Sequence, residues 1–516
     1  MFAGLRHSLH LTYVGLVLMR EGVFALIPRA EVPPPLRPLL WLLSIFARRD
    51  AGDRGQRIVA ALTRLGPSYV KLGQFLATRP DLVGFSLAKD LEALQDRMPA
   101  FPQAEAEARV AEALGKPLAD VFDSFGPAVA AASIAQVHKA MLRYGDERRE
   151  VAVKVLRPGV AKIFTRDIKA QHYVASLMER FSAEARRLKP SEVIETLERT
   201  VKLEMDLRFE ASALSEMAEN VAQDPEFRVP GVYWEATARE CLTLEWIDGI
   251  KLNDNAAIDA AGIDRVALAR VTMQSFLRHA LRDGFFHADM HPGNLFVLRD
   301  GTLVAVDLGI MSRLGLKERR FLAEILYGFI TRDYMRIAQV HFDAGYVPQK
   351  HRVEDFAQAL RAVGEKIHGR NAADISMAHM LGLLFEITGL FDMATRTELV
   401  LLQKTMVVVE GVSRHLDPDF NMWKAAEPVI REWIERNLGP VGKLEEFGRD
   451  TASLLRAATR LPEIVERTDR ALGEWEARHA LGGSLPLEQR AAPAPRYPHL
   501  VWWVIAAALV AIAIRL

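Results

Sequence analysis

Polar side chains between His287 and Gly309 have the types and the spacing that phosphoryl transfer requires. The chain reads His-Ala-Asp-Met-His-Pro-Gly-Asn from His287 to Asn294, and Asp-Leu-Gly begins at Asp307 after an apolar run. Asn294 lies five positions after Asp289, and Asp307 lies thirteen positions after Asn294. These are the spacings of a protein-kinase catalytic loop and its metal-binding Asp-Phe-Gly motif. We therefore expect ATP and Mg²⁺ to bind at this segment.

Each of these residue types has its own task in that chemistry. Phosphoryl transfer needs a carboxylate near the attacking hydroxyl, and an amide and a second carboxylate that hold Mg²⁺ against the phosphates. We expect Asp289 to be the catalytic carboxylate, and Asn294 and Asp307 to be the metal ligands. Leu308 replaces the usual Phe and preserves an apolar side chain at that position.

The histidines in this segment have two other interpretations. His287, Asp289 and His291 alternate along an extended stretch, so they can form a transition-metal cluster. Alternatively, the two histidines only brace the loop through hydrogen bonds to the backbone. The Asn and the Asp-Leu-Gly further along the chain favour the kinase-like interpretation.

Lys154 interrupts an apolar, strand-like run from Val151 to Val155. An unpaired ammonium group there is costly, so we expect Lys154 to contact an acidic partner and the nucleotide phosphates, with a lysine at the sheet edge as the alternative. Glu204 and Glu210 lie on a segment with the pattern of one helix. Six residues turn a helix by about 600°, so the two carboxylates suit two separate lysines, unless both are simply solvated.

The segment before the lysine strand lacks the Gly-rich loop of ordinary kinases. An alanine-rich stretch from Pro127 to His138 occupies its place. Alanine permits close backbone approach, but its Cβ restricts positive φ, which predicts altered nucleotide selectivity or a disfavoured protein-kinase pose. A serine in this stretch either adds a hydroxyl to phosphate or metal or is an ordinary turn residue. The residues expected to bind nucleotide here are Ala130, Ala131, Ala132 and Ser133.

The elements that must hold these groups follow an order of helices, a small sheet and more helices. Tyr144-Gly145-Asp146 separates two strand-like runs and predicts a β-hairpin. The order fits a two-lobed, helix-rich α+β fold. The predicted helices cover 57–94, 105–114, 191–220 and most of the chain after 256, and the predicted strands cover 135–143, 151–156, 231–234 and 242–246.

Composition excludes some classes of partner and site. The 516 residues contain 66 Lys and Arg and 66 Asp and Glu, so no net field attracts nucleic acid. The single cysteine, Cys241, cannot form an internal disulfide, and its strand-like surroundings predict a buried apolar role. Arg20-Glu21 interrupts the first apolar stretch and no small-residue cleavage site follows, so we expect no secretory signal.

Segments at both ends of the chain predict membrane association. Residues 1–50 are apolar and basic, and they either cover the domain or lie on a bilayer as interfacial helices. After a linker at 481–499, the tail 500–516 contains fifteen uncharged residues that include Trp502-Trp503. At about 1.5 Å per residue this run is shorter than the roughly 30 Å hydrocarbon core, yet we expect it to insert. The arginines before it predict that the catalytic body stays on the cytoplasmic side.

The chain is similar to the UbiB family of atypical kinase-like proteins over roughly residues 62–421. Met290, where the family often has Pro, and Leu308 are departures that remove no catalytic group. The shared motifs are Lys-x-Gly-Gln at 71–74, Leu-Gln-Asp at 94–96, the alanine-rich loop with Gln-Val-His at 136–138, Lys154, Glu-x-Asp at 204–206 with Glu-Ala at 210–211, Glu-Trp-Ile-Asp-Gly at 245–249, His-Ala-Asp-x-His-Pro-Gly-Asn at 287–294, and Glu-Gly at 410–411 with Leu-Asp-Pro-Asp at 416–419.

The resemblance implies a kinase-like fold with an N-terminal helical extension that lies across the active site and hinders protein substrates. It implies binding of ATP or ADP with Mg²⁺ and a requirement in ubiquinone biosynthesis at the bacterial inner membrane. The implied partners are membrane lipid or isoprenoid quinone precursors and other quinone-biosynthesis enzymes. The apolar tail also permits a homodimer.

The resemblance also assigns roles that residue chemistry alone does not. Lys and Gln on a helix most often face solvent, yet the resemblance pairs Lys71 with Glu204 and makes these two residues and Gln74 regulatory. Lys154 then pairs with Glu210. The backbone groups implied to contact adenine belong to Glu245 and Ile247.

Three classes of function follow from these features. The first is an ATP-dependent phosphotransferase or ATPase, the second is a nucleotide-binding scaffold without catalysis, and the third is a zinc hydrolase. The expected organisation is apolar N-terminal helices at 1–50, a helical extension at 51–115, a kinase-like N-lobe at 116–250, a helical C-lobe at 251–480, a linker at 481–499 and a membrane tail at 500–516.

Overall fold

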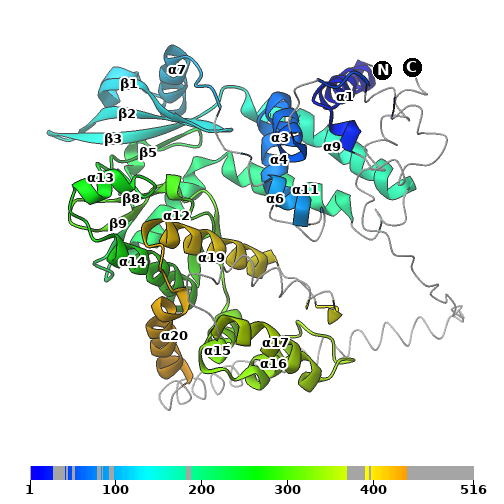
Figure 1. Cartoon of the computed structure of the whole chain (residues 1–516). Helices are drawn as coiled ribbons and strands as arrows, with labels where there is room; N and C mark the ends of the chain where they lie inside the picture. The colour runs from blue at the N-terminus through cyan, green and yellow to red at the C-terminus, as the bar shows by residue number, and fades with distance from the viewer. Residues whose placement is uncertain are drawn as a thin grey trace, which may run out of the picture.

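A computed structural model arranges the chain as a helical extension, a lobe built on a small sheet, and a helical lobe (Figure 1). This helix-rich α+β architecture agrees with the predicted two-lobed kinase-like fold. The residues that the structure describes are 2–26, 41, 45–48, 53–77, 83, 85–91, 94, 98–181, 186, 189–368, 387, 390–393 and 397–438.

The extension consists of short helices that pack beside the small-sheet lobe (Figure 1). Asp53 and Gln56 form a capping box that starts α3, and Gly66, at a φ of +105°, ends it. Gly73 lets α4 approach its neighbours, because a Cβ there would lie 2.3 Å from Leu94 Cδ1. The described elements of this part are α1 (Phe2–Arg20), a 3-10 turn (Val23–Leu26), α3 (Arg54–Leu65), α4 (Pro67–Ala77) and α6 (Phe85–Leu91).

The small-sheet lobe contains an antiparallel sheet in the order β1-β2-β3-β5. Val151, Val153 and Val155 are fully buried on one face of β3, so the two-residue period of the strand turns Lys154 to the other face. The predicted hairpin is confirmed, with Gly145 at a φ of +58° in its turn. The strands are β1 (Phe122–Ala131), β2 (Ala135–Tyr144), β3 (Glu147–Leu156) and β5 (Cys241–Glu245), and α7 (Gln103–Leu114) and α8 (Leu118–Val121) pack on them.

Two helices between β3 and the rest of this lobe contact the extension. α9 (Val160–Phe181) packs against α11 (Pro190–Glu204), and α9 also contacts α1 and α4. The predicted single helix over 191–220 is wrong. The chain leaves the helical conformation at Met205, and the Asp206 side chain then accepts a hydrogen bond from the backbone of Arg208 to start α12 (Leu207–Asn220). Asp at this N-cap position stabilises a new helix start.

The helical lobe is built around α14 (Arg265–Arg278), which is buried on nearly all sides. It packs against α19 and α20, and α15 also packs against α20. The surrounding helices are α13 (Asn255–Ala260), α15 (Leu316–Thr331), α16 (Tyr334–Asp343), α17 (Val353–His368), α19 (Thr397–Leu416) and α20 (Met422–Leu438).

Short strands lie between the lobes and carry the loops of interest. They form a sheet in the order β4-β9-β8-β6 and a separate pair, β7 with β10. The predicted strand at 231–234 is wrong, because this segment makes only a single bridge at Val232 before a 3-10 turn at Trp234–Ala236. The strands are β4 (Phe227–Arg228), β6 (Ile250–Lys251), β7 (Phe285–His287), β8 (Leu295–Val297), β9 (Leu303–Ala305) and β10 (Met311–Arg313).

Cys241 is fully buried in β5, and burial raises the pKa of its thiol to about 12. The predicted structural role is confirmed, because a reactive cysteine needs an accessible thiolate.

The segments predicted to contact a membrane are described only in part. On α1, Val17 packs against Leu65 and Tyr69, while Tyr13 and Leu16 are exposed. This helix therefore covers the extension with one face. No helix in the described ranges is both long and apolar enough to span a bilayer. The predicted linker 481–499 and tail 500–516, including the tail helix, lie outside the described residues.

Candidate active site

Lys154, Glu210 and Asp307 meet between the two lobes. The Lys154 Nζ lies 2.9 Å from both Glu210 carboxylate oxygens and 3.2 Å from Asp307 Oδ1. The Lys154 and Glu210 side chains are only 14% and 7% exposed, whereas Asp307 is 45% exposed. The implied pairing of Lys154 with Glu210 is therefore present, and Asp307 forms the open side of the cluster.

Burial and charge act on this cluster in opposite directions. Burial disfavours the charged form of Lys154, but the carboxylates of Asp307 and Glu210 outweigh it and raise the lysine pKa. Burial also opposes ionisation of Asp307, yet Lys154 and the Gly309 N–H keep its pKa well below the usual range. Burial raises the pKa of Glu210 to about 7, against the opposing charge of Lys154. Asp307 thus remains an anion, as a metal ligand must.

The loop that carries Asp289 is braced by its own histidines. The Asp289 N–H donates to His287 Nδ1 at 3.0 Å, and the Gly293 N–H donates to His291 Nδ1 at 3.1 Å. This is the bracing role that the sequence left open. Within the described ranges no group of three His, Cys, Asp or Glu is arranged to hold a metal ion, so His287, Asp289 and His291 do not form the cluster that was the other interpretation.

Asn294 joins the loop that carries Asp289 to the segment that leads to Asp307. Its side-chain Nδ2 donates to the Asp289 carbonyl at 3.2 Å, and its own carbonyl accepts from the Val306 N–H at 3.0 Å. The first contact orients the Asn294 amide. The second fixes the backbone at Val306, and Asp307 is the next residue in the chain.

The side chains of Asn294 and Asp307 fit a magnesium ion in chemical type. Mg²⁺ prefers oxygen ligands and usually binds through one or two carboxylates together with phosphates. Because Asn294 uses its Nδ2 within the loop, its Oδ1 is the atom available to a metal. Asp307 is anionic and partly exposed. These two residues would hold Mg²⁺ here.

The alanine-rich segment forms the end of β1 and the turn into β2. Ala130 and Ala131 end the strand, and Ala132 and Ser133 lie in the turn that follows. Ala130 is exposed, whereas the Ser133 side chain is fully buried. The strand β1 was not predicted, because Gly126, Pro127 and the alanines have low strand propensity, and its register is irregular in this stretch.

The segment after β5 contains the two residues expected to contact adenine. The Glu245 carboxylate accepts two hydrogen bonds from Arg228, at 2.9 and 3.0 Å, and one from the Gly231 N–H at 3.2 Å. Burial opposes the charged form of Glu245, but Arg228 keeps its pKa below the ordinary value. The Glu245 N–H donates to the Gly231 carbonyl, so this group is already engaged, and the partly buried Ile247 lies just beyond the strand.

Lys71 and Glu204 form a second enclosed ion pair, between the extension and the end of α11. Lys71 Nζ lies 2.7 Å from Glu204 Oε2, and the two side chains are 12% and 8% exposed. The general expectation that a helical lysine faces solvent is wrong here, whereas the pairing implied by the resemblance is present. Gln74 Nε2 donates to the Leu94 carbonyl at 3.5 Å and so binds within the extension.

The sequence matches known proteins over most of its length. The ABC1 atypical kinase-like domain matches residues 93–341, and the UbiB helical domain matches residues 360–421. A protein of Marinobacter nauticus named "Probable protein kinase UbiB" is 37% identical over 485 residues, covering 92% of this chain and 88% of that protein. The chain belongs to the UbiB family of atypical kinase-like proteins.

A solved structure of a Mycobacterium tuberculosis protein in complex with erythromycin is similar in part. It is 24% identical, covers 72% of this UbiB-family chain and 93% of that protein, and has a TM-score of 0.49.

Contacts from the helical lobe, which sequence reasoning missed, support the candidate catalytic loop, residues 287–294, of this UbiB-family protein. Thr405 on α19 is 1% exposed, and its hydroxyl lies 3.0 Å from the Ala288 carbonyl and 2.8 Å from the Leu401 carbonyl of its own helix, within hydrogen-bond distance of both. On the other side, the Ala288 N–H donates to the Ile310 carbonyl at 2.9 Å. A buried threonine has no distinguishing pattern in a sequence, because its partner here is a backbone oxygen.

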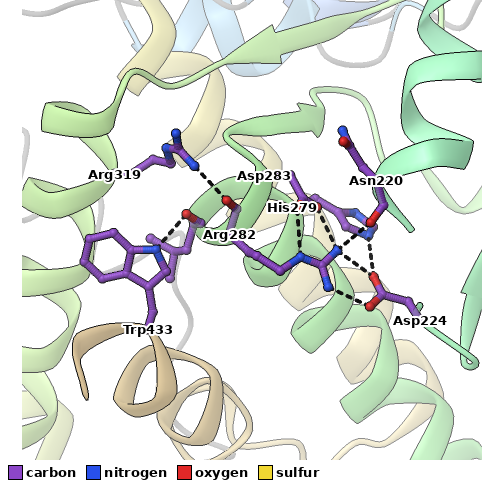
Figure 2. A network of polar contacts seen from close by, with 8 residues as sticks. Asn220, Asp224, His279, Arg282, Asp283, Arg319 and Trp433 are labelled. Atoms are coloured by element: carbon purple, nitrogen blue, oxygen red, sulfur yellow. Dashed lines mark hydrogen bonds and ion pairs between the residues drawn. The ribbon is translucent and has the colours of Figure 1, made fainter. Parts of the chain in front are cut away.

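A polar network also anchors the chain that leads into this loop (Figure 2). Arg282 lies in one π-helical turn, His279–Asp283, that follows α14. Its guanidinium binds the Asp224 carboxylate through two contacts, at 2.7 and 2.9 Å, and the Asn220 carbonyl at 3.1 Å. The Arg282 carbonyl accepts from Arg319 at 2.7 Å. A π-turn of this kind is frequent at functional sites.

The buried His279 and the partly buried His341 predict acid sensitivity. Burial lowers the pKa of His279 to about 3 and that of His341 to about 4. An ordinary histidine in the unfolded chain binds its proton near pH 6.5, so their contribution to stability is complete above that pH and is lost as the pH falls. We expect each to lower the free energy of unfolding by about 2 kcal/mol between pH 7 and pH 5.

Urea unfolding at the two pH values measures this effect. His341→Leu removes one titrating ring, so its loss of stability between pH 7 and pH 5 should be smaller than that of the wild type. Equal pH dependence in both proteins would contradict a neutral His341 in the folded state.

Proposed function

We propose that this protein is an ATP-dependent phosphotransferase or ATPase that supports ubiquinone biosynthesis. The proposal rests on the arrangement of Lys154, Glu210 and Asp307, with the Lys154 Nζ within 3.2 Å of both carboxylates. An active protein kinase needs the lysine to glutamate pair and the metal-binding Asp in place at the same time. The family of the chain supports the same conclusion.

The residues divide the work of phosphoryl transfer. Lys154, held by Glu210, binds the nucleotide phosphates, and Asn294 and Asp307 hold Mg²⁺. When bound, Mg²⁺ neutralises charge on the phosphates. Asp289 accepts the proton of the attacking hydroxyl or orients an attacking water. The alanine-rich turn and the backbone at Glu245 and Ile247 position the nucleotide.

The proposed setting is the cytoplasmic face of a bacterial inner membrane. The acceptor class is a membrane lipid or an isoprenoid quinone precursor, and other quinone-biosynthesis enzymes are the expected protein partners. Family membership supports this setting. The exposed side chains of Tyr13 and Leu16 on α1 are compatible with contact between this helix and a membrane surface.

A nucleotide-binding scaffold is the second candidate. The enclosed Lys71 and Glu204 pair fixes the extension to α11, and the first turn of the nucleotide site carries alanines where kinases carry glycines. Both features disfavour a protein substrate. In this function the chain would bind nucleotide and organise the biosynthetic enzymes without transferring phosphate.

Asp289→Asn distinguishes the two candidates. The change removes the carboxylate and preserves the shape, so an enzyme should fail to restore quinone synthesis in a deficient strain, whereas a scaffold should restore it. Asp120→Asn, at an exposed position on α8, is the matched control and should restore synthesis in either case. Full restoration by Asp289→Asn would overturn the proposed catalytic function.

A further inference from the structure

The turn Ala132–Ile134, which follows the exposed Ala130, is bound at both ends by one arginine. Arg157 Nε donates to the Ala132 carbonyl at 2.8 Å, and the Arg157 N–H donates to the Ile134 carbonyl at 2.8 Å. Both ends of the turn Ala132–Ile134 are thereby bound to a single residue just past β3. The turn therefore has little freedom to change shape independently of Arg157.

The same guanidinium reaches the segment Met98–Phe101, which lies between the extension and α7. Arg157 Nη2 donates to the Pro99 carbonyl at 2.9 Å, and its guanidinium carbon lies 5.8 Å from the centre of the Phe101 ring. The Met98 N–H donates to the Ala131 carbonyl at 3.2 Å. We call Met98–Phe101 the linker segment. It contacts the end of β1 through its backbone and the turn Ala132–Ile134 through Arg157.

Gln136, in β2 two residues after this turn, makes a second connection to the linker segment. Its Oε1 accepts from the Phe101 N–H at 2.9 Å, and its Nε2 donates to the Phe101 carbonyl at 3.3 Å. The side chain is 1% exposed, so water does not replace these contacts. A buried amide that loses such partners leaves unsatisfied polar groups, which costs about 1–3 kcal/mol.

His138 fixes the orientation of that amide. Its Nδ1 lies 2.8 Å from the Gly126 carbonyl and must donate to it, which leaves Nε2 as the acceptor for Gln136 Nε2 at 2.9 Å. The ring is fully buried and stacks against Phe125, with ring centroids 4.6 Å apart. Gln136 is therefore held in the one orientation that binds both backbone groups of Phe101.

We propose that Arg157 and Gln136 are positioning residues that lock the nucleotide turn Ala132–Ile134 to the linker segment Met98–Phe101, so that nucleotide affinity depends on where the linker segment lies. This inference rests on the proposed nucleotide binding. Because coupling free energies are reciprocal, bound nucleotide must in turn stabilise the linker segment. Displacement of the extension, to which the linker segment leads, would then weaken nucleotide binding from outside the site.

Arg157→Lys and Gln136→Met test the lock from its two sides. Lysine keeps the positive charge but lacks the planar fork that reaches two carbonyls at once, and methionine keeps the volume of glutamine. Both variants are therefore expected to fold. Arg148→Lys, at the exposed far end of β3, is the matched control. The measurements are the Kd for a fluorescent ADP with Mg²⁺ and hydrogen exchange of the amides of 98–101 with and without ADP.

We expect each lock variant to bind ADP about tenfold more weakly than the wild type and Arg148→Lys, within the usual range of coupling. ADP should slow amide exchange of the linker segment in the wild type and fail to do so in Arg157→Lys. If both lock variants bound ADP with wild-type affinity, and ADP slowed amide exchange of the linker segment in them as it does in the wild type, the coupling would be overturned. The proposed nucleotide binding would still stand. Absence of ADP binding by the wild type would overturn the proposed function, and the coupling with it.

Discussion

Asp307→Asn is expected to abolish ATP turnover while the protein stays folded. The substitution removes the anion that would hold Mg²⁺ and that contacts Lys154 Nζ at 3.2 Å. A catalytic metal contributes several kcal/mol of charge stabilisation, and each 1.36 kcal/mol is tenfold in rate. Turnover should therefore fall by at least about 100-fold.

The assay compares purified wild type and Asp307→Asn with ATP, Mg²⁺ and a detergent-solubilised phenolic isoprenoid. Asp300→Asn, in the turn between β8 and β9, is the matched control, because it makes the same chemical change at an exposed position. Turnover that is stimulated by the lipid and lost only in Asp307→Asn would support an enzyme. Nucleotide binding without turnover in any of the three proteins would favour the scaffold.

The arrangement of the candidate catalytic loop, residues 287–294, could be predicted from the sequence because its geometry is local. Asp289 and Asn294 lie on one short loop, and the spacing to Asp307 is set by a single β-hairpin, β8 with β9. Such a short spacing limits the relative positions of these side chains independently of how the rest of the chain folds. The partner of Lys154 is 56 residues away; the helix pattern offered Glu204 and Glu210 as partners for lysines, and only the resemblance assigned Glu210 to Lys154.

The residues that support the site had no comparable signal. Arg157 and Thr405 bind backbone carbonyls, so no partner side chain marks them in the sequence. The break between α11 and α12 depends on Asp206 acting as an N-cap, which a hydrophobic period across 191–220 conceals. The chain at this point can either start a new helix at the N-cap or continue one long helix, and tertiary contacts decide between the two. Here those contacts are the separate ion pairs of Glu204 with Lys71 and of Glu210 with Lys154.

Lys71→Met should strongly destabilise the attachment of the extension. Lys71 and Glu204 are both enclosed, so the substitution leaves a carboxylate buried without its ion-pair partner. Removing one member of a buried pair typically costs about 3–5 kcal/mol. We expect a loss of this size in urea unfolding, or an early separate transition with faster proteolysis within the extension.

The double variant Lys71→Met with Glu204→Gln separates charge from packing. A neutral pair of similar volume is often tolerated where a single buried charge is not, so the double variant should recover much of the loss. Lys189→Met is the matched control, because Lys189 and Glu192 form an exposed pair that should contribute little. If Lys71→Met lowered the free energy of unfolding no more than Lys189→Met does, the Lys71 and Glu204 pair would not be what holds the extension on α11. The extension would then depend on apolar packing of α4 and on the hydrogen bond from Ser68 to the buried Asp167.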